Sequence, residues 1–294
     1  NQDERIVRCL EILHIQAQGL ATRLSKIHCK DVVIGISGGL DSTLALLVCH
    51  EAFKINNYDS KGIHAITMPG FGTTKRTKSN AQILMDLLHV SSEEISIVDG
   101  VNQHFKDIHH DPEIHNITYE NSQARERTQI LMDLSNAYNA IVVGTGDLSE
   151  LALGWCTYNG DHMSMYAVNA SVPKTLVRYI VESVALKDEI LHDVLMDICD
   201  TPVSPELLPP DKNGKIAQKT EEVLGSYDLH DFFLYQMLRH HDEPKKIYDL
   251  ACVAFKDVEK ETIKKAIVTF YNRFFTQQFK RNCMPDGVKV GSIC

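Results

Sequence analysis

A carboxylate in an unusual setting stands early in the chain: Asp41, in the sequence S-G-G-L-D-S at residues 37–42. The apolar run 32–36 before it is typical of a buried parallel strand, and residues 42–48 after it are typical of a helix. Such a turn can bind an anion, because glycines let the backbone approach a ligand and the helix start offers free N–H groups. A carboxylate there repels bare phosphate, so we interpret Asp41 as a ligand of Mg²⁺ that arrives with a nucleotide. The alternative is a strand–helix turn that binds nothing.

The turn at residues 37–42 differs from two common nucleotide-binding motifs. It lacks the Gly-Lys-Ser/Thr of a Walker loop and the G-x-G-x-x-G spacing of a dinucleotide fold. Its pattern, S-G-G-x-D-S, resembles instead the pyrophosphate loop of enzymes that split ATP into AMP and pyrophosphate. That resemblance predicts an ATP site at this turn.

A second polar turn follows a later apolar run. Residues 144–155 read G-T-G-D-L-S-E-L-A-L-G-W and continue directly from the run 140–144. The glycines and the hydroxyl of Thr145 suit a nucleotide, and Glu150 lies about one helical turn into the next predicted helix. There it can face the same cleft as Asp41, so that the two carboxylates share one Mg²⁺ bound to triphosphate oxygens. The alternative is that Glu150 is a helix N-terminal acid that complements the helix dipole.

Alternating strands and helices must position these turns. Apolar runs predict strands at residues 32–36, 62–68, 94–98 and 140–144. Apolar residues at helical spacing predict helices at 3–26, 77–89 and 119–138, besides the one that starts at 42. The alternation predicts an α/β fold with a doubly wound, Rossmann-like parallel sheet, in which ligands gather beyond the carboxyl ends of the strands.

The sheet pattern fades after residue 187. We expect a short helix at 188–199, a proline-rich loop within 200–226 and three helices from residue 228 onward. A loop of this length is typical of a lid or of disorder. The predicted organisation is a single domain over 1–294, with an N-terminal helix (1–30), a nucleotide-binding core (31–187) and a helical extension (188–294).

Composition restricts the class of partner. The 294 residues include 30 Lys and Arg against 39 Asp and Glu, a formal charge of −9, which argues against non-specific nucleic-acid binding. The eight cysteines show no C-x-x-C or zinc-ligand spacing and are typical of reduced thiols in an intracellular protein. We find no apolar segment long enough to span a membrane and no signal peptide, so we expect a cytoplasmic protein.

Several further segments are shared with one family. Besides G-I-S-G-G-L-D-S (35–42) and residues 144–155, they are M-P-G-F-G-T (68–73), E-N-S-Q-A-R (120–125) and V-P-K-T-L (172–176). In this combination the chain resembles NAD synthetase, and more narrowly the synthetase domain of the glutamine-dependent, two-domain form. The resemblance extends to residue 281. It implies a fold of the adenine nucleotide alpha-hydrolase type, a homodimer, and an upstream glutaminase domain in cis that a chain beginning at Asn1 does not contain.

The resemblance also implies a two-step reaction. The nicotinate carboxylate of deamido-NAD attacks the α-phosphorus of ATP, which gives an acyl-adenylate and pyrophosphate. Ammonia, derived from glutamine where a glutaminase domain is present, then attacks the activated carbonyl and releases NAD and AMP. The implied substrates are therefore ATP, deamido-NAD and ammonia, with Mg²⁺ as the cofactor and with neither nucleic acid nor membrane as a partner.

The matching motifs imply a set of site residues. Asp41, Glu150 and Lys174 would be catalytic, with Asp41 and Glu150 on the metal and Lys174 on the phosphates. The resemblance assigns ATP binding to Gly35, Ile36, Ser37, Gly38, Gly39, Leu40, Asp41, Ser42, Thr145 and Lys174. It assigns deamido-NAD binding to Asn121, Arg125, Glu150, Trp155, Cys156, Thr157, Tyr158 and Lys280.

Some of these assignments have structural alternatives. Trp155 is the only tryptophan, and it is either a platform on which the pyridine ring stacks or a core aromatic. For Arg125 and Lys280 the alternative is a solvated surface. Two histidine-containing segments, 109–115 and 240–242, are weak candidates for metal sites, because adjacent histidines face different ways.

Other functions stay open from the sequence. GMP synthetase and tRNA-thiolating enzymes also carry a pyrophosphate loop, although thiolating enzymes usually need paired cysteines and a basic surface. A nucleotide-binding module without turnover is the non-enzymatic alternative. Against that module stands the complete set of Ser37, Asp41, Thr145, Glu150 and Lys174.

Overall fold

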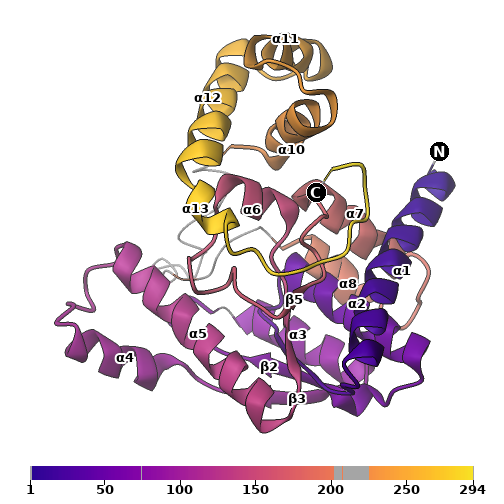
Figure 1. Cartoon of the computed structure of the whole chain (residues 1–294), viewed down its shortest axis with the longest axis vertical. Coiled ribbons are helices and arrows are strands. Elements are labelled where there is room, and N and C mark those ends of the chain that lie inside the picture. The colour runs from indigo at the N-terminus through magenta and orange to yellow at the C-terminus, as the bar shows by residue number, and fades with distance from the viewer. Residues whose placement is uncertain (1, 74, 202–206, 208–224, 294) are drawn as a thin grey trace.

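The computed structural model describes residues 2–73, 75–201, 207 and 225–293 (Figure 1). Its centre is a five-stranded sheet in the order β3-β2-β1-β4-β5, and each neighbouring pair of strands is parallel. The strands are β1 (Val32–Gly35), β2 (Ile63–Thr67), β3 (Ser91–Glu94), β4 (Ile141–Gly144) and β5 (Tyr166–Ala167). The predicted doubly wound α/β fold is confirmed.

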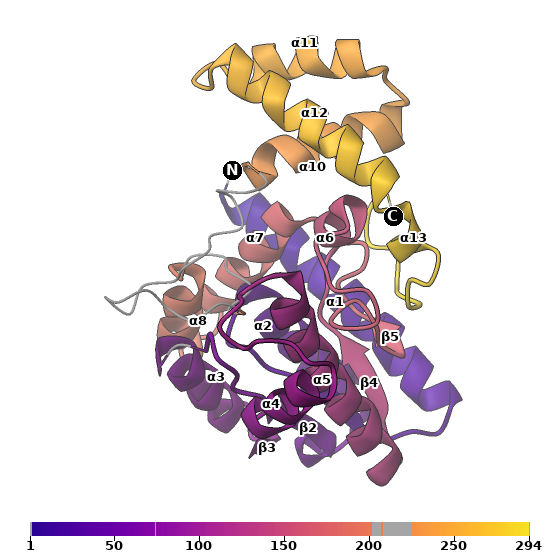
Figure 2. The ribbon, with the colours of Figure 1, turned by 90° about the vertical axis from the view of Figure 1, so that its left-hand side faces the viewer.

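Helices connect the strands and cover both faces of the sheet (Figures 1 and 2). They are α1 (Gln2–Lys26), α2 (Leu40–Asn56), η1 (Ser60–Gly62), α3 (Lys75–Leu87), α4 (Val98–Asp107), α5 (Ile117–Ala137), α6 (Leu148–Leu153), α7 (Lys174–Ala185) and α8 (His192–Cys199). The N-terminal helix α1 packs against α2 and α7, and α8 packs against α3 and α7. None of the described helices is both long and apolar enough to cross a membrane.

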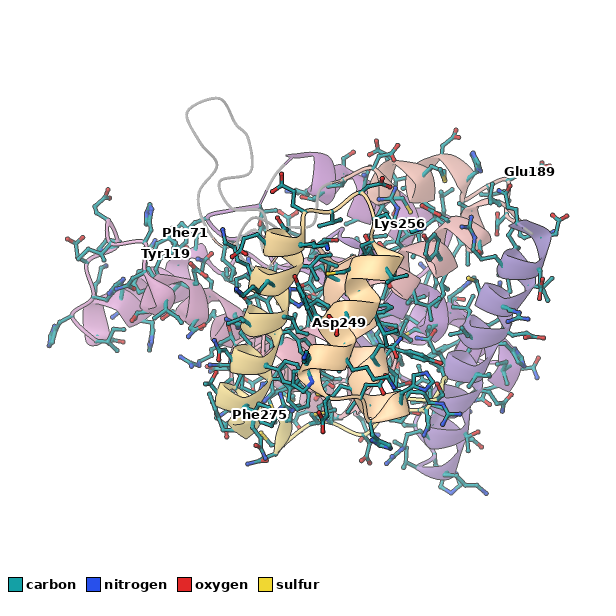
Figure 3. All side chains as sticks on the ribbon, turned by 90° about the horizontal axis from the view of Figure 1, so that it is seen from above. Phe71, Tyr119, Glu189, Asp249, Lys256 and Phe275 are labelled. Atoms are coloured by element: carbon teal, nitrogen blue, oxygen red, sulfur yellow. The ribbon has the colours of Figure 1, made fainter. Side chains whose placement is uncertain are left out.

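The central strand β1 divides its side chains between two apolar cores. Val32 and Ile34 pack in a core with residues of α1, α2 and α7, whereas Val33 packs in a second core with residues of α4 and α5. This alternation follows from the two-residue period of a strand, and it explains why β1 is apolar throughout. In the second core Phe71 and Tyr119 lie together, with ring centroids 5.4 Å apart (Figure 3).

The C-terminal helices form a third apolar core, which we call the C-terminal layer. They are α10 (Tyr227–Tyr235), η2 (Gln236–His240), α11 (Pro244–Ala254), α12 (Lys260–Thr276) and α13 (Gln278–Arg281). Phe233 of α10 and Phe270 of α12 meet edge to face, with centroids 5.8 Å apart. Both helices pack against α6, and both ribbon views place the layer over the end of the sheet where α6 lies (Figures 1 and 2). The three helices expected after residue 228 are therefore present.

The third strand was predicted at the wrong residues. It spans 91–94 instead of 94–98, and its exposed side chains are mostly polar because β3 is the edge strand. The apolar residues that suggested a strand, Ile95 and Ile97, follow it. Their N–H groups donate to the carbonyls of Thr67 and Pro69, and their side chains pack in the second core. The apolar pattern therefore identified the buried segment between β3 and α4 and missed the strand that pairs with β2.

Two further boundaries differ from the expectation. The strand β5, of two residues, has no counterpart among the predicted strands, because so short a segment carries no periodicity. The helix expected from residue 188 begins at His192, since residues 189–191 form a turn in which Asp188 accepts hydrogen bonds from Ile190 and Leu191. The proline-rich loop at 200–226 lies largely outside the described residues.

Candidate active site

The turns after β1 and β4 bring three carboxylates together at the carboxyl edge of the sheet. Asp41 stands in the first turn of α2, Asp147 is the N-cap of α6, and Glu150 stands in the first turn of α6. One carboxylate oxygen from each lies within 4.8 Å of the others. The two strands are parallel neighbours, so their ends open onto one crevice, as expected where the strand order reverses. The structure thus places Asp41 and Glu150 on the same crevice, together with Asp147.

Lys174, the first residue of α7, lies among these three carboxylates. Its Nζ is 2.7 Å from Asp41 Oδ2, 2.7 Å from Asp147 Oδ2 and 2.8 Å from Glu150 Oε1. The lysine side chain is only 4% exposed. We call Asp41, Asp147, Glu150 and Lys174 the acidic cluster. The sequence predicted Lys174 as a phosphate contact, and in this structure its ammonium is enclosed by carboxylates.

Asp147 was not among the predicted site residues. Its side chain is fully buried, and its Oδ1 accepts a hydrogen bond of 2.8 Å from the Glu150 N–H. This contact fixes the start of α6 and thereby the direction in which Glu150 leaves the helix. The sequence contains a signal for it, because an aspartate three residues before a glutamate, ahead of an apolar run, is the pattern of a capping box.

Burial governs the protonation of the cluster. It raises the pKa of Glu150 to about 7 and the pKa of Asp147 well above its usual value, although the nearby Lys174 ammonium acts in the opposite direction. For Lys174, burial alone would lower the pKa, but the carboxylates of Asp147, Asp41 and Glu150 outweigh it and raise the pKa well above its usual value. The ammonium is therefore a permanent charge, whereas two of the carboxylates gain or lose protons with their surroundings.

The donor set of the cluster fits a hard divalent cation. Asp41 Oδ1 is buried and has no hydrogen-bond partner in the described part of the chain. Three carboxylates around one ammonium leave negative charge that a second cation would balance, and carboxylate oxygen is the ligand type that Mg²⁺ prefers. Within the described ranges the histidine segments 109–115 and 240–242 form no comparable group.

The glycine turn before α2 is shaped by tight backbone contacts. Gly38 has φ +86°, and a Cβ there would lie 2.2 Å from the carbonyl oxygen of Thr77, so only glycine fits. Ser42 Oγ donates to Gly39 O at 3.1 Å, and its own oxygen lies 3.1 Å from Ser37 Oγ. The N-cap of α2 is Gly39, which has no side chain to cap the helix, so the first N–H groups of α2 are available to an anion.

Asn169 ties the two turns to each other. It is fully buried, and its Nδ2 donates to the carbonyl oxygens of Asp41 at 3.0 Å and Thr145 at 3.1 Å. Gln16 of α1 in turn donates to Asn169 Oδ1 at 3.0 Å. The spacing between the glycine turn and the turn after β4 therefore depends on an amide that no motif singled out.

One cavity of about 560 Å³ joins the glycine turn, the acidic cluster and the segment after α6. Twelve predicted site residues line it: Gly35, Ile36, Ser37, Asp41, Ser42, Asn121, Thr145, Glu150, Trp155, Cys156, Thr157 and Lys280. The other predicted residues lie outside its lining: Gly38, Gly39, Leu40, Arg125, Tyr158 and Lys174. Of these, Lys174 lies directly behind Asp41 and Glu150, while Arg125 is exposed and donates to the Tyr158 carbonyl at 3.2 Å.

Residues 154–157 form another part of the cavity wall, and we call residues 154–158 the tryptophan turn. Thr157 Oγ1 donates to Asn121 Oδ1 at 2.8 Å, and the Thr157 N–H donates to Asp161 Oδ1 at 2.7 Å. Lys280 of α13 donates to the carbonyls of Gly154 at 2.8 Å and Cys156 at 2.6 Å. Lys280 therefore holds the turn from the C-terminal layer while it also faces the cavity.

Sequence reasoning missed several residues of this wall. Asp161, Arg273 and Gln277 line the cavity, and burial raises the pKa of Asp161 and lowers that of Arg273. Asp161 stands in a segment rich in turn residues close to Trp155, which is a weak signal. Arg273 and Gln277 lie about 120 residues farther along, and nothing in their spacing connects them to the sheet edge.

The chain matches a family model described as NAD synthase over residues 12–283. The glutamine-dependent NAD(+) synthetase of Mycobacterium leprae is 41% identical over 308 residues, which cover 96% of this chain and 45% of that protein. The NH(3)-dependent NAD(+) synthetase of Trichlorobacter lovleyi is 27% identical over 92% of this chain and 87% of its own length. The chain thus spans about half the length of the glutamine-dependent relative and most of the ammonia-dependent one.

Solved structures agree with the fold. A glutamine-dependent NAD(+) synthetase from Cytophaga hutchinsonii superposes with a TM-score of 0.75 at 19% identity, over 96% of this chain and 52% of that one. An NMN synthetase from Francisella tularensis superposes with a TM-score of 0.68 at 21% identity, over 92% of this chain and 95% of that one. At these identities the likeness concerns the architecture alone.

Proposed function

Because this chain belongs to the NAD synthase family, we propose that it catalyses the ATP-dependent amidation of deamido-NAD to NAD. The observation that carries the proposal is that a single cavity joins the glycine turn, the acidic cluster and the tryptophan turn. The first two suit a nucleotide triphosphate, and the third offers an aromatic wall to a planar ring. A site for ATP alone would not need the third element.

In the proposed first step the nicotinate carboxylate attacks the α-phosphorus of ATP. The new bond is between a carboxylate oxygen and phosphorus, the α–β bridging bond breaks, and pyrophosphate leaves with the electron pair. The open N–H groups at the start of α2 and the hydroxyls of Ser37 and Ser42 would hold the pyrophosphate. Lys174 would turn its ammonium from the carboxylates toward the phosphates, a short movement because Asp41 and Glu150 already face the cavity.

We assign Mg²⁺ to Asp41 and Glu150. When bound, the ion would neutralise the triphosphate oxygens and favour the departure of pyrophosphate. Asp147, which caps α6, would keep Glu150 directed at the cavity. A cation at Asp41 and Glu150 would also favour the ionised form of Glu150, whose pKa burial raises to about 7.

In the proposed second step ammonia attacks the acyl-adenylate carbonyl, the bond from that carbon to the bridging oxygen breaks, and AMP leaves with the oxygen. The attacking nitrogen loses one proton, which a phosphate oxygen of the departing AMP can accept. This step needs little acid–base chemistry if ammonia arrives unprotonated, so it depends on orientation and on the exclusion of water. Asn121, Trp155 and Thr157 line the cavity and would orient the pyridine ring. We also assign Cys156, Tyr158, Arg125 and Lys280 to the neighbourhood of the dinucleotide.

We further propose the organisation that the family resemblance suggests. The protein would be a cytoplasmic homodimer. Each chain would be a single domain made of an N-terminal helix (1–30), a nucleotide-binding core (31–187) and a helical extension (188–294). It would receive ammonia from a glutaminase domain in cis if the full-length protein carries one, as the chain's coverage of 45% of a glutamine-dependent relative permits.

The direct assay supplies ATP, Mg²⁺, ammonium and deamido-NAD and measures NAD, AMP and pyrophosphate. We expect one of each product per turnover and no ADP. With ¹⁸O in the nicotinate carboxylate, one labelled oxygen should appear in AMP, because the bridging oxygen leaves with the adenylate. ADP formation, or unlabelled AMP, would contradict the mechanism. Nicotinate mononucleotide serves as a comparison substrate that lacks the adenylate half.

Asp41→Asn tests the metal assignment. We expect a loss of pyrophosphate formation of about a hundredfold or more, with the cooperative unfolding transition retained. Asp99→Asn is the matched control, because Asp99 is likewise an acid in the first turn of a helix and is not among the residues that line the cavity. Normal activity in Asp41→Asn would show that the metal assignment is wrong.

A further inference from the structure

Arg273 of α12 reaches across to the end of α6, where the tryptophan turn begins. Its Nε donates to the carbonyl of Leu153 at 2.9 Å, and its Nη2 donates to the carbonyl of Gly154 at 3.3 Å. Its guanidinium carbon lies over the ring of Trp155, 5.1 Å from the centroid. One side chain thus holds both the backbone that carries Trp155 and the indole itself.

No carboxylate of the described residues forms an ion pair with Arg273. Among the described residues its partners are two carbonyls and an aromatic ring, and burial lowers its pKa. A half-buried guanidinium without a carboxylate is costly unless its donors and its face are used. Here the N–H groups of the Arg273 guanidinium donate to the two carbonyls, and its planar face covers the indole. This arrangement fixes the orientation of the indole ring.

The backbone around Trp155 is fixed from the same side. Gly154 has φ +59°, and a Cβ there would lie 2.3 Å from Gln277 Cβ at the end of α12. The Trp155 N–H donates to Glu150 O at 2.9 Å. The backbone of Trp155 is therefore held between Glu150 and α12, and the cavity is lined by Trp155, Arg273 and Gln277 together.

We propose that Arg273 is a positioning residue that holds the Trp155 ring in place as the wall on which the pyridine ring of the substrate stacks. This inference rests on the proposed function for the identity of the stacking ring. It concerns binding of the dinucleotide and predicts no role for Arg273 in ATP binding. It also gives the C-terminal layer a task in the site, since Arg273 comes from α12.

Arg281 of α13 provides a matched control within the same layer. It donates to the carbonyl of Ala152 at 2.8 Å and to that of Phe274, and its guanidinium carbon lies 4.1 Å from the Phe274 ring centroid. It therefore binds the end of α6 and an aromatic ring, as Arg273 does. It neither lines the cavity nor contacts Trp155 in the described structure.

The experiment compares Arg273→Met, Arg273→Lys and Arg281→Met. Trp155 is the only tryptophan, so intrinsic fluorescence reports this ring alone, and a pyridinium ring that stacks on indole quenches its emission. We expect Arg273→Met to raise both the KM and the quenching Kd for deamido-NAD about tenfold, the range of one desolvated cation–π contact. The KM for ATP should not change, and kcat should change much less than KM. Arg273→Lys, which keeps the cation and loses the fork, should lie between Arg273→Met and the wild type.

The control separates positioning from stability. Arg281→Met should lower the melting temperature by a similar amount and leave both the quenching and the KM at wild-type values. Emission of the unliganded protein gives a second readout, because a released indole should emit at longer wavelength in Arg273→Met and not in Arg281→Met. Should Arg273→Met fail to fold, Arg273→Lys carries the same test.

Two results would overturn the inference: wild-type quenching and KM in a folded Arg273 variant, or equal shifts in Arg281→Met. The proposed function fails differently. If deamido-NAD neither quenches the wild-type protein nor yields NAD, the substrate is wrong, while the unliganded emission still decides whether Arg273 positions Trp155.

Discussion

The acidic cluster and the tryptophan turn stand in one cavity but are held in different ways. In the acidic cluster, charged side chains hold one another: Lys174 Nζ lies within 2.8 Å of three carboxylates from turns at adjacent strand ends. In the tryptophan turn, the backbone carbonyls of Gly154 and Cys156 accept hydrogen bonds from two cations, Arg273 and Lys280, which come from helices more than a hundred residues later. The first region is fixed by its own charges and the second by the docking of another layer.

This difference has a consequence for function. Charges that compensate one another can exchange partners when a nucleotide and a cation arrive, so the acidic cluster suits a chemical step. Carbonyls clamped by cations cannot exchange without loss of the turn's shape, so the tryptophan turn suits recognition of a rigid ring. We therefore expect changes in the cluster to affect stability and kcat, and changes in the turn to affect KM for the dinucleotide.

The largest effect should come from Lys174→Met. Without the ammonium, three carboxylates, one of them fully buried, lose their counter-charge, so the free energy of unfolding should fall by about 3–5 kcal/mol at neutral pH. Chemical denaturation measures it. Arg8→Met is the control, because Arg8 forms an exposed pair with Glu4 at 2.6 Å and its loss should cost less than about 1 kcal/mol. Equal losses in the two variants would show that the cluster is not held by charge.

The pH dependence of stability should distinguish the two regions next. Burial raises the pKa of Glu150 from 4.5 to about 7, so between these values the native state holds a proton that the unfolded chain has released. The free energy of unfolding should therefore fall as pH rises from about 4.5 to about 7, by at most a few kcal/mol. Glu150→Gln cannot ionise, so its stability relative to the wild type should rise over this range and level off above it.

Arg273→Met is the corresponding variant for the tryptophan turn, which Arg273 contacts from α12. A guanidinium stays protonated over the whole range, so the difference in unfolding free energy between this variant and the wild type should not change with pH. A constant difference for Glu150→Gln as well would contradict the raised pKa. Denaturation midpoints in a buffer series from pH 4.5 to pH 8 provide both comparisons.

The same difference explains what the sequence could reveal. Asp41 and Glu150 follow apolar strands that are adjacent in a parallel sheet, so strand order alone brings them together, and local spacing predicted it. Asp147 was missed although its capping pattern is local, because a cap and a buried carboxylate look alike in sequence. Arg273 depends on how α10 and α12 pack together on α6, and this packing involves contacts between distant residues, such as Phe233 with Phe270, that no local pattern encodes.

The strands show the same rule. Doubly buried β1 and β4 are apolar throughout and were predicted within one residue of their ends. The edge strand β3 faces solvent, so hydrogen bonds to β2 and not hydrophobicity decide where it lies. Local sequence pattern therefore predicts strands whose position depends on burial, and it fails for a strand whose position depends on hydrogen bonds to a partner distant in sequence.

Asp231 of α10 connects the C-terminal layer to the elements that carry the acidic cluster, and Asp231→Ala should affect both stability and activity. Its carboxylate accepts hydrogen bonds from Ser149 Oγ, from Thr175 Oγ1 at 2.7 Å and from the Thr175 N–H at 3.0 Å. Ser149 Oγ also accepts from the Lys174 N–H at 2.9 Å, so the first turn of α7 depends on this network. We expect a loss of about 2 kcal/mol in the free energy of unfolding and a fall in kcat, because the Thr175 N–H in the first turn of α7 loses its acceptor and Lys174 is the neighbouring residue.

Asp228→Ala on the same helix is the control. Asp228 is an exposed acid in the first turn of α10, and its removal should cost no more than about 1 kcal/mol and leave kcat unchanged. If Asp231→Ala lowered stability by a similar small amount, the C-terminal layer would be independent of the acidic cluster.

The smallest and most selective effect should come from Gly154→Ala. The left-handed φ and the approach of Gln277 Cβ to 2.3 Å should together cost about 1–2 kcal/mol in the free energy of unfolding. The KM for deamido-NAD should rise while the KM for ATP stays constant, because the displaced turn carries Trp155. Gly38→Ala imposes the same kind of strain in the glycine turn, because the added Cβ would lie 2.2 Å from the Thr77 carbonyl oxygen. This variant should raise the KM for ATP and leave the KM for deamido-NAD unchanged. Gly291→Ala is the control, because no atom lies within 4 Å of the added Cβ. Its free energy of unfolding should stay within about 0.5 kcal/mol of the wild type. If Gly154→Ala and Gly38→Ala each raised the KM values for ATP and deamido-NAD equally, the acidic cluster and the tryptophan turn would not serve separate substrates.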